Sequence, residues 1–235
     1  MLSGIMRSFQ YNPCNAVGTA RTKLMQNAPQ ETPQAAFWNR VARRYAAMPM
    51  RKPEAWEETL DRTRAHLSKD ARVLELGCGT GSTALRLAPD VQEYVASDDA
   101  AEMIMIATER GQDVANLRPV QARTGDGSIP LGPYDAVLAF NLLHLLPDLP
   151  VALNEARSLL KPGGLLITKT PCLGGTYRIL WPVVRLLRAF GKAPPLKFLT
   201  PDQLERSITL AGFTIMERDD LPKKPPSRFV VARRH

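Results

Sequence analysis

The sequence predicts an α/β fold in which a mostly parallel sheet of seven strands carries helices on both faces. Short apolar segments alternate with segments of helical periodicity from about residue 72 to the end of the chain, as in repeated βαβ units. The first apolar segment ends in three closely spaced glycines directly before a helical segment, which lets the backbone turn sharply and approach a ligand. A chain of 235 residues with 44% hydrophobic content can also bury one sizeable core.

Two regions precede the alternating part of the chain. Residues 1–30 contain basic residues, no acidic residue and several Ser, Thr, Asn and Gln residues, which predicts a disordered N-terminal extension or, alternatively, a transit peptide. Apolar residues then recur at spacings of three and four from Thr32 to Leu67, with a break around Pro49 and Pro53. We therefore expect an N-terminal helical cap over residues 31–70 and the main domain over residues 71–235.

The alternation assigns each element of the main domain in turn. We expect strands at residues 72–76, 93–97, 117–122, 134–140, 165–170, 214–218 and 229–232. Helices are expected between them at residues 82–87, 101–109, 149–160 and 201–210. Only a short segment separates the last two strands, so they are expected to form an antiparallel hairpin at one edge of the sheet.

Charge and composition exclude several classes of partner. The net charge is +8, but residues 1–52 carry eight basic residues against Glu31 alone, a net charge of +7 that leaves 8 − 7 = +1 for the rest. This small remainder argues against a nucleic-acid acceptor. The three cysteines and three histidines lack the spacing of a metal site. We therefore expect no metal and a reducing, cytoplasmic location, or an organellar one if residues 1–30 are a transit peptide.

The apolar middle of the chain does not predict a membrane span. Its longest uncharged stretch, residues 136–147, is about half of the roughly 20 residues that a spanning helix needs. We therefore expect a soluble protein.

The segment Glu75-Leu76-Gly77-Cys78-Gly79-Thr80-Gly81 carries the clearest chemical signal. The N–H groups at the start of the following helix favour a negative group. A dinucleotide site has the spacing G-x-G-x-x-G, whereas this segment has G-x-G-x-G and a preceding carboxylate. The spacing therefore argues against a nicotinamide-dependent dehydrogenase.

This combination resembles the first motif of the class I, Rossmann-like S-adenosylmethionine-dependent methyltransferases of the small-molecule type (type 11), and the resemblance extends over residues 71–235. Asp98 ends the second strand and Met103 follows it by five residues, as in the second motif of that family. The resemblance implies that Asp98 accepts hydrogen bonds from the ribose hydroxyls of the cofactor, which suits a carboxylate. It also implies that Met103 packs near the adenine. Asp99 is the neighbouring alternative to Asp98.

Later landmarks follow in the order of the family. The resemblance implies that the Asp126 side chain binds the adenine amino group and that the Gly127 N–H binds a ring nitrogen of the adenine. Asn141 to His144 follow the fourth strand, as in the fourth motif of the family. The implied cofactor is S-adenosylmethionine, with S-adenosylhomocysteine as product. Cys78 has no basic partner nearby in sequence and is expected to fill space in a tight loop. The implied cofactor-binding set is Glu75, Gly77, Cys78, Gly79, Gly81, Asp98, Met103, Asp126, Gly127 and Asn141.

Two residues are candidates for a direct part in the reaction. His144 follows a central strand, where an imidazole can take a proton from a phenol, a thiol or an ammonium group. A hydrogen-bonded structural histidine is the competing interpretation. Tyr45 resembles the aromatic residue that many small-molecule methyltransferases bring over the cofactor from an N-terminal helix, and ordinary packing explains it equally well.

Residues 172–199 form an inserted segment between the fifth strand and the late helix. Arg178, Arg185, Arg188 and Lys192 fall near one helical face, which predicts a basic amphipathic helix kinked at Pro182. We interpret this segment as a lid over an apolar acceptor, a transient contact with a membrane surface, or a homodimer contact.

The sequence therefore predicts an S-adenosylmethionine-dependent methyltransferase that acts on a small, apolar acceptor. Quinone-like, phenolic and lipid-related molecules are the leading acceptors, with small thiols beside them. The alternative is a non-catalytic S-adenosylmethionine-binding assembly or regulatory protein, and methyl transfer to any acceptor would distinguish the two.

Overall fold

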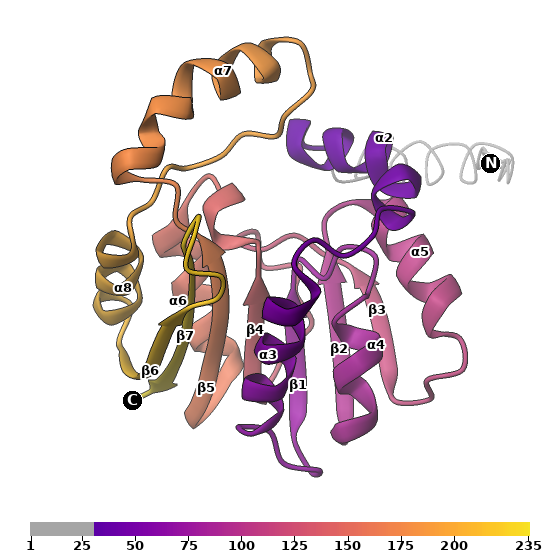
Figure 1. Ribbon diagram of the computed structural model, residues 1–235. Helices are drawn as coiled ribbons and strands as arrows, with labels where there is room; N and C mark the ends of the chain where they lie inside the picture. The colour runs from indigo at the N-terminus through magenta and orange to yellow at the C-terminus, as the bar shows by residue number, and fades with distance from the viewer. Residues whose placement is uncertain (1–30) are drawn as a thin grey trace, which may run out of the picture. The chain divides into compact units, whose positions relative to one another are not determined.

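Seven strands form one sheet in the computed structural model, which describes residues 31–235 (Figure 1). Their order across the sheet is β3-β2-β1-β4-β5-β7-β6. The first five strands are parallel, and β7 runs antiparallel to both β5 and β6. The predicted α/β sheet and its edge hairpin are therefore confirmed. The strands are β1 (Arg72–Leu76), β2 (Glu93–Asp98), β3 (Leu117–Gln121), β4 (Tyr134–Phe140), β5 (Leu160–Pro171), β6 (Phe213–Asp220) and β7 (Ser227–Arg234).

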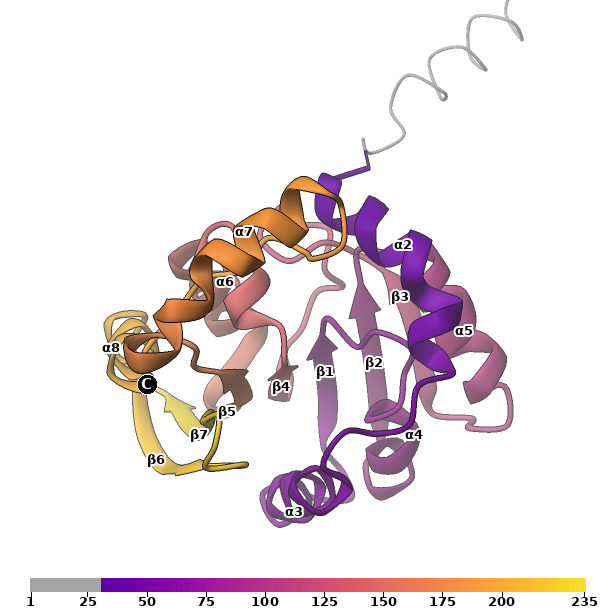
Figure 2. The same ribbon diagram turned by 45° about the horizontal axis from the view of Figure 1, so that its top comes forward.

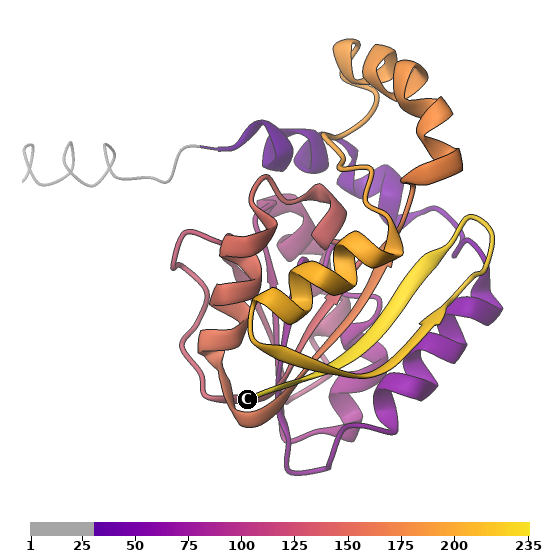
Figure 3. The same ribbon diagram turned by 90° about the vertical axis from the view of Figure 1, so that its left-hand side faces the viewer.

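Helices cover both faces of this sheet (Figures 1 and 3). The α-helices are α2 (Pro33–Ala46), α3 (Pro53–Arg64), α4 (Ala84–Leu87), α5 (Ala101–Gly111), α6 (Leu149–Leu159), α7 (Trp181–Ala189) and α8 (Pro201–Leu210). Short 3₁₀ turns are η1 (Ala88–Asp90), η2 (Leu143–Leu145) and η3 (Gly175–Leu180).

Most elements begin and end close to the predicted residues, and the differences have physical reasons. Strands β5, β6 and β7 run longer than predicted because their backbones continue to pair beyond the apolar segments, as far as Pro171 opposite Ser227. Pro182 does not kink a continuous helix. It is the second residue of α7, a position where a missing N–H costs no helical hydrogen bond.

Helix α8 shows how a local sequence sets a boundary. The Thr200 side chain accepts the Gln203 N–H, and the Gln203 side chain accepts the Thr200 N–H. This capping box satisfies two donors that no helical carbonyl reaches, and Pro201 follows it as a favoured first residue. The helix therefore has the predicted bounds.

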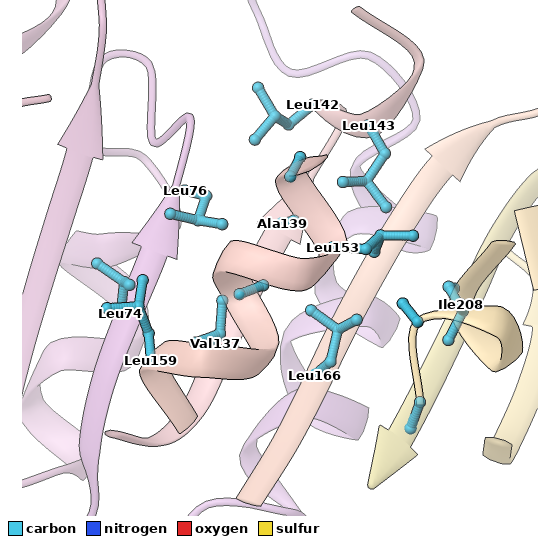
Figure 4. Close-up of a cluster of buried hydrophobic side chains, with 14 of the residues drawn as sticks. Leu74, Leu76, Val137, Ala139, Leu142, Leu143, Leu153, Leu159, Leu166 and Ile208 are labelled. Carbon is cyan, nitrogen blue, oxygen red and sulfur yellow. The ribbon is translucent and has the colours of Figure 1, made fainter. Parts of the chain in front are cut away.

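Two apolar clusters fill the faces of the sheet. Leu74 and Leu76 of β1 pack with Leu153 of α6 and Ile208 of α8 on one face (Figure 4). Val73 points to the other face, since side chains alternate along a strand, and there the cluster includes residues of α3 and α4. The central strands are thus buried on both sides, which holds their ends in fixed positions.

The two N-terminal helices pack in different places within the unit Pro33–His235. Helix α3 covers the sheet: Leu60 is fully buried, and Lys169 of β5 donates to Thr59 Oγ1 at 2.8 Å. Helix α2 packs on α5 through Ala42 and Met103. The division into a cap and a main domain stays a prediction.

The extension expected over residues 1–30 lies outside the described residues, as does its interpretation as a transit peptide. None of the helices within residues 31–235 is long and apolar enough to cross a membrane.

Candidate functional site

Three glycines shape the loop between β1 and α4. Gly77, Gly79 and Gly81 have positive φ angles of 65°, 55° and 77°, a conformation that residues with a Cβ rarely adopt. A Cβ on Gly77 would lie 2.6 Å from Leu142 Cδ1, so this glycine lets the chain after β4 pack against the loop. A Cβ on Gly79 would meet no protein atom within 4 Å. The loop therefore presents bare backbone to open space at Gly79.

Asp98 supports this loop from the end of β2. Its carboxylate oxygens accept hydrogen bonds from the Gly79 and Ala100 N–H groups, each at 2.9 Å. Burial raises the pKa of Asp98 to about 6, against the opposing effect of the two N–H donors. Asp99 instead pairs with Arg123 Nε at 3.2 Å. Asp98 is thus the acid that shapes the loop, and a carboxylate with two N–H donors keeps lone pairs for further hydroxyl donors.

Glu75 lies in the buried part of β1. The Tyr94 hydroxyl of β2 donates to Glu75 Oε2 at 2.8 Å, and burial raises the pKa of Glu75 to about 7. The nearby Cys78 thiol is also buried, which raises its pKa well above the ordinary value, so it stays a neutral thiol as expected of a space-filling residue. The implied contact of Glu75 with the cofactor stays a prediction.

The turn after β3 is held by Glu155 of α6, a residue that sequence reasoning missed. Its carboxylate accepts the Gly125 N–H at 2.6 Å and the Gly127 N–H at 3.1 Å. Asp126 is exposed, and its Oδ1 accepts the Ser128 N–H at 2.9 Å. The Gly127 N–H, which the resemblance gives to adenine, is therefore paired with Glu155. The implied role of Gly127 stays a prediction that requires Glu155 to release it.

Asn141 follows β4 in a left-handed conformation, with φ of 55°. Asn is among the residues that tolerate this conformation best. Its N–H donates to the Lys169 carbonyl of β5 at 2.7 Å, and its side chain is exposed. The turn thus redirects the chain away from the sheet and into η2.

His144 sits in η2 and is 8% exposed. Within the part of the chain that the structure describes, no group makes a hydrogen bond with its buried Nδ1 atom. Burial lowers the pKa of His144 to about 4, so the ring is neutral at pH 7. Its carbonyl accepts the Lys197 N–H at 2.7 Å. A neutral imidazole with a free ring nitrogen can receive a proton or a hydrogen bond from a ligand.

Helix α2 carries Tyr45, which is 47% exposed and interacts electrostatically with Asp98. The Tyr45 ring meets Trp38 edge to face at 5.7 Å between centroids, and desolvation together with the negative charge of Asp98 raises the pKa of Tyr45. Met103 is buried with Ala42 between α2 and α5. The structure therefore gives Met103 a packing role, and its contact with adenine stays a prediction.

These residues gather at one edge of the sheet. The strand order reverses between β1 and β4, the place where ligands bind in open α/β sheets. Helices α2 and α7 lie beyond the carboxyl ends of these strands (Figure 2). Over residues 31–235, no three His, Cys, Asp or Glu side chains are grouped to hold a metal ion.

Comparison with known proteins matches the part of the chain that forms this edge to one protein family. The family described as "Methyltransferase domain" matches residues 46–218, which include every candidate site residue except Tyr45. The highly reducing polyketide synthase otaA of Aspergillus carbonarius is 31% identical over 174 residues, covering 63% of this chain and 7% of its own length. The methyltransferase AacuQ of Aspergillus aculeatus is 31% identical over 130 residues, covering 55% of this chain and 40% of its own. The chain therefore spans only a small part of such synthases.

Solved structures show the same fold. The DhpI–SAH complex superposes with a TM-score of 0.65 at 23% identity, covering 86% of this chain and 95% of that one. The CurJ carbon methyltransferase superposes with a TM-score of 0.56 at 25% identity, covering 71% of this chain and 49% of that one.

Proposed function

Because this chain belongs to the methyltransferase-domain family, we propose that it transfers the methyl group of S-adenosylmethionine to a small, apolar acceptor. The loop at residues 77–81 carries the proposal. Its backbone is bare at Gly79 and hydrogen-bonded to Asp98, at the place where the strand order reverses. This arrangement fits a ligand that approaches the backbone closely and carries hydroxyl groups.

The chain offers three groups to hold the cofactor. The Asp98 carboxylate at the end of β2 is hydrogen-bonded to the Gly79 backbone of the loop, and Asp126 is exposed on the turn after β3. S-adenosylmethionine, when bound, supplies a methyl group on a sulfonium centre that is ready for in-line displacement. The chain has to align the acceptor, keep water away and remove a proton from acceptors that carry one.

His144 suits the proton-removing role. It is buried and neutral, and Leu142, two residues earlier, packs against the glycine loop at Gly77. With its pKa lowered to about 4, the imidazole is a weak base, so it serves acceptors with comparatively acidic protons. Phenols, quinols, thiols and activated carbon acids meet this condition better than aliphatic alcohols.

The relatives support an apolar acceptor. The name of otaA connects it with polyketide synthesis, and that of CurJ connects it with methylation of carbon. We therefore include activated carbon atoms beside oxygen and sulfur in the acceptor class.

Calorimetric titration with S-adenosylmethionine and S-adenosylhomocysteine is the first test. The same sample would then be assayed for S-adenosylhomocysteine release with hydrophobic phenols, quinols, thiols, activated carbon acids and amines. We expect binding of both nucleosides and turnover on one apolar class. Binding without turnover on any class would favour a non-catalytic cofactor-binding protein, and no binding would refute the proposal.

A further inference from the structure

We propose that α7 docks on the surface of an anionic lipid bilayer and so brings the candidate site to the membrane. Val183, Leu186, Leu187 and Phe190 have the i, i+3, i+4, i+7 spacing of one helical face. Their exposed fractions are 55%, 59%, 39% and 71%, and no residue of α7 is buried. Three neighbouring apolar side chains on α7, with a fourth directly after its last residue, differ from scattered exposed residues, which need no partner.

The charge around this stripe selects the partner. Residues 172–200 carry Arg178, Arg185, Arg188, Lys192 and Lys197 and no acidic residue. Residues 32–52, which include α2 at the same edge, carry Arg40, Arg43, Arg44, Arg51 and Lys52, again without an acidic residue. Among these, Arg43 pairs with Glu109 on α5. A surface of this charge attracts an anionic bilayer, whereas a second copy of the chain would bring like charges together across a two-fold interface.

The two sides of α7 match an interfacial helix. Arg185 and Arg188 lie on the side opposite the apolar stripe, as expected from a helix of about 3.6 residues per turn. The Arg185 guanidinium carbon is 5.2 Å from the centre of the Trp181 ring. Such a helix lies in the plane of the interface, with its apolar face toward the acyl chains and its basic side chains reaching the headgroups.

The base of the segment ties it to the candidate site. The Gly174 N–H donates to the Leu199 carbonyl at 2.8 Å, and the Lys197 N–H donates to the His144 carbonyl at 2.7 Å. Arg40 Nη2 of α2 donates to the Gly191 carbonyl at 2.7 Å. Helices α7 and α2 both lie beyond the same edge of the sheet (Figure 3). Docking would therefore hold the edge of the sheet that contains His144 near acceptors dissolved in the bilayer, a consequence that rests on the proposed function although the docking does not.

Cosedimentation of the full chain with vesicles tests the docking. The vesicles would contain phosphatidylcholine alone or phosphatidylcholine mixed with phosphatidylglycerol. We expect binding to the anionic vesicles, weaker binding at high salt, and little binding to phosphatidylcholine alone. The double variants Leu186→Asp/Phe190→Asp and Arg185→Glu/Arg188→Glu should each weaken binding by about tenfold or more.

Two variants of α8 serve as matched controls. Leu210 is 81% exposed and Arg206 is exposed, so Leu210→Asp and Arg206→Glu make the same types of substitution once each away from α7 and should bind vesicles like the wild type. Wild-type binding by both α7 variants, or no binding by the wild type, would overturn the proposal. If the wild type forms a dimer, does not bind vesicles, and loses the dimer in Leu186→Asp/Phe190→Asp, the apolar stripe would instead contact a second copy of the chain. If the wild type does not bind vesicles and Leu186→Asp/Phe190→Asp alters the KM for a water-soluble acceptor, the stripe would instead belong to a lid over the site.

A calorimetric titration with S-adenosylhomocysteine on each variant separates the two proposals. Unchanged affinity together with lost vesicle binding would show that docking, and not the cofactor site, has been removed.

Discussion

At the scale of single residues, Asp98 combines two tasks that one substitution removes together. Its carboxylate accepts the Gly79 N–H and is the expected partner of the ribose hydroxyls. We expect Asp98→Ala to weaken binding of S-adenosylhomocysteine by more than about tenfold, an effect of about 1.4 kcal/mol or above. Calorimetric titration measures this directly. Asp99→Ala is the control because it removes the pair with Arg123 and leaves the loop contact, and a larger loss in this control would refute the assignment.

His144 is the residue at which chemistry and structure are hardest to separate. If it removes a proton from the acceptor, His144→Gln should lower kcat by about 10²-fold or more while the affinity for S-adenosylhomocysteine stays unchanged. The imidazole must be unprotonated to act. Since burial holds the pKa of His144 near 4, kcat measured with the cofactor and the acceptor at saturation should not fall through protonation of His144 until the pH drops below about 5.

A structural role for His144 predicts a different result. His144→Gln would then lower Tm and the cofactor affinity together, because the packing of the buried ring in η2 would be disturbed. Thermal unfolding of the same samples used for kinetics decides between the two roles.

The candidate site residues could be predicted from the sequence only where a local pattern carries them. The glycines, Asp98 and His144 follow strand ends in a recognisable order, and the fold brings these strand ends to one edge. Glu155 gave no such signal, because its partners Gly125 and Gly127 come from a different part of the chain. An acid within a predicted helix looks like any solvated side chain until that distant turn is in place.

At the scale of elements, α2 is attached to the rest of the unit mainly through α5. Ala42 is fully buried against Met103 and Ile106, and α2 carries Tyr45, which interacts electrostatically with Asp98. Ala42→Asp would bury an unpaired carboxylate and should release α2. We expect weaker binding of S-adenosylhomocysteine with little change in far-UV circular dichroism, since the sheet does not depend on α2.

The exposed Ala47, just after α2, provides the matched control. Ala47→Asp introduces the same charge without burial and should bind the cofactor like the wild type. If Ala42→Asp also binds like the wild type, then α2 plays no part in the site.

Element boundaries were predictable where the determinants are local. Thr200, Pro201 and Gln203 lie within four residues of one another, and the helix that they start has the predicted bounds. The ends of β5 and β7 depend on pairing between residues far apart in the sequence, such as Pro171 and Ser227. No local pattern reports such pairing, so these strands were predicted too short.

At the scale of the whole molecule, Glu75 and Lys169 make the stability of the free protein depend on pH in opposite windows. Burial raises the pKa of Glu75 from 4.5 to about 7. Its contribution to the free energy of unfolding is therefore complete below pH 4.5 and is lost as pH rises to about 7. Burial lowers the pKa of Lys169 from 10.5 to about 8, so its contribution is regained only as pH rises from about 8 toward 10.5. The combined contribution of the two groups is therefore smallest between about pH 7 and 8.

Chemical denaturation across this pH range tests the sign of both effects. Relative to the wild type, Glu75→Gln should gain free energy of unfolding as pH rises from about 5 to about 7. The free energy of unfolding of Lys169→Met, relative to the wild type, should be constant up to about pH 8 and fall at higher pH. A difference that does not change with pH would contradict the expected contribution of that residue.

The hydrogen bond between Gly174 and Leu199 has a consequence for the evolution of such chains. Because the two ends of the segment already meet, the sheet is insensitive to what lies between them, and the entropic cost of closing a longer loop grows only slowly with its length. Lineages can therefore shorten, lengthen or exchange this stretch while inheriting the cofactor edge unchanged. A change of acceptor or of location in the cell can then arise by replacement of one surface segment.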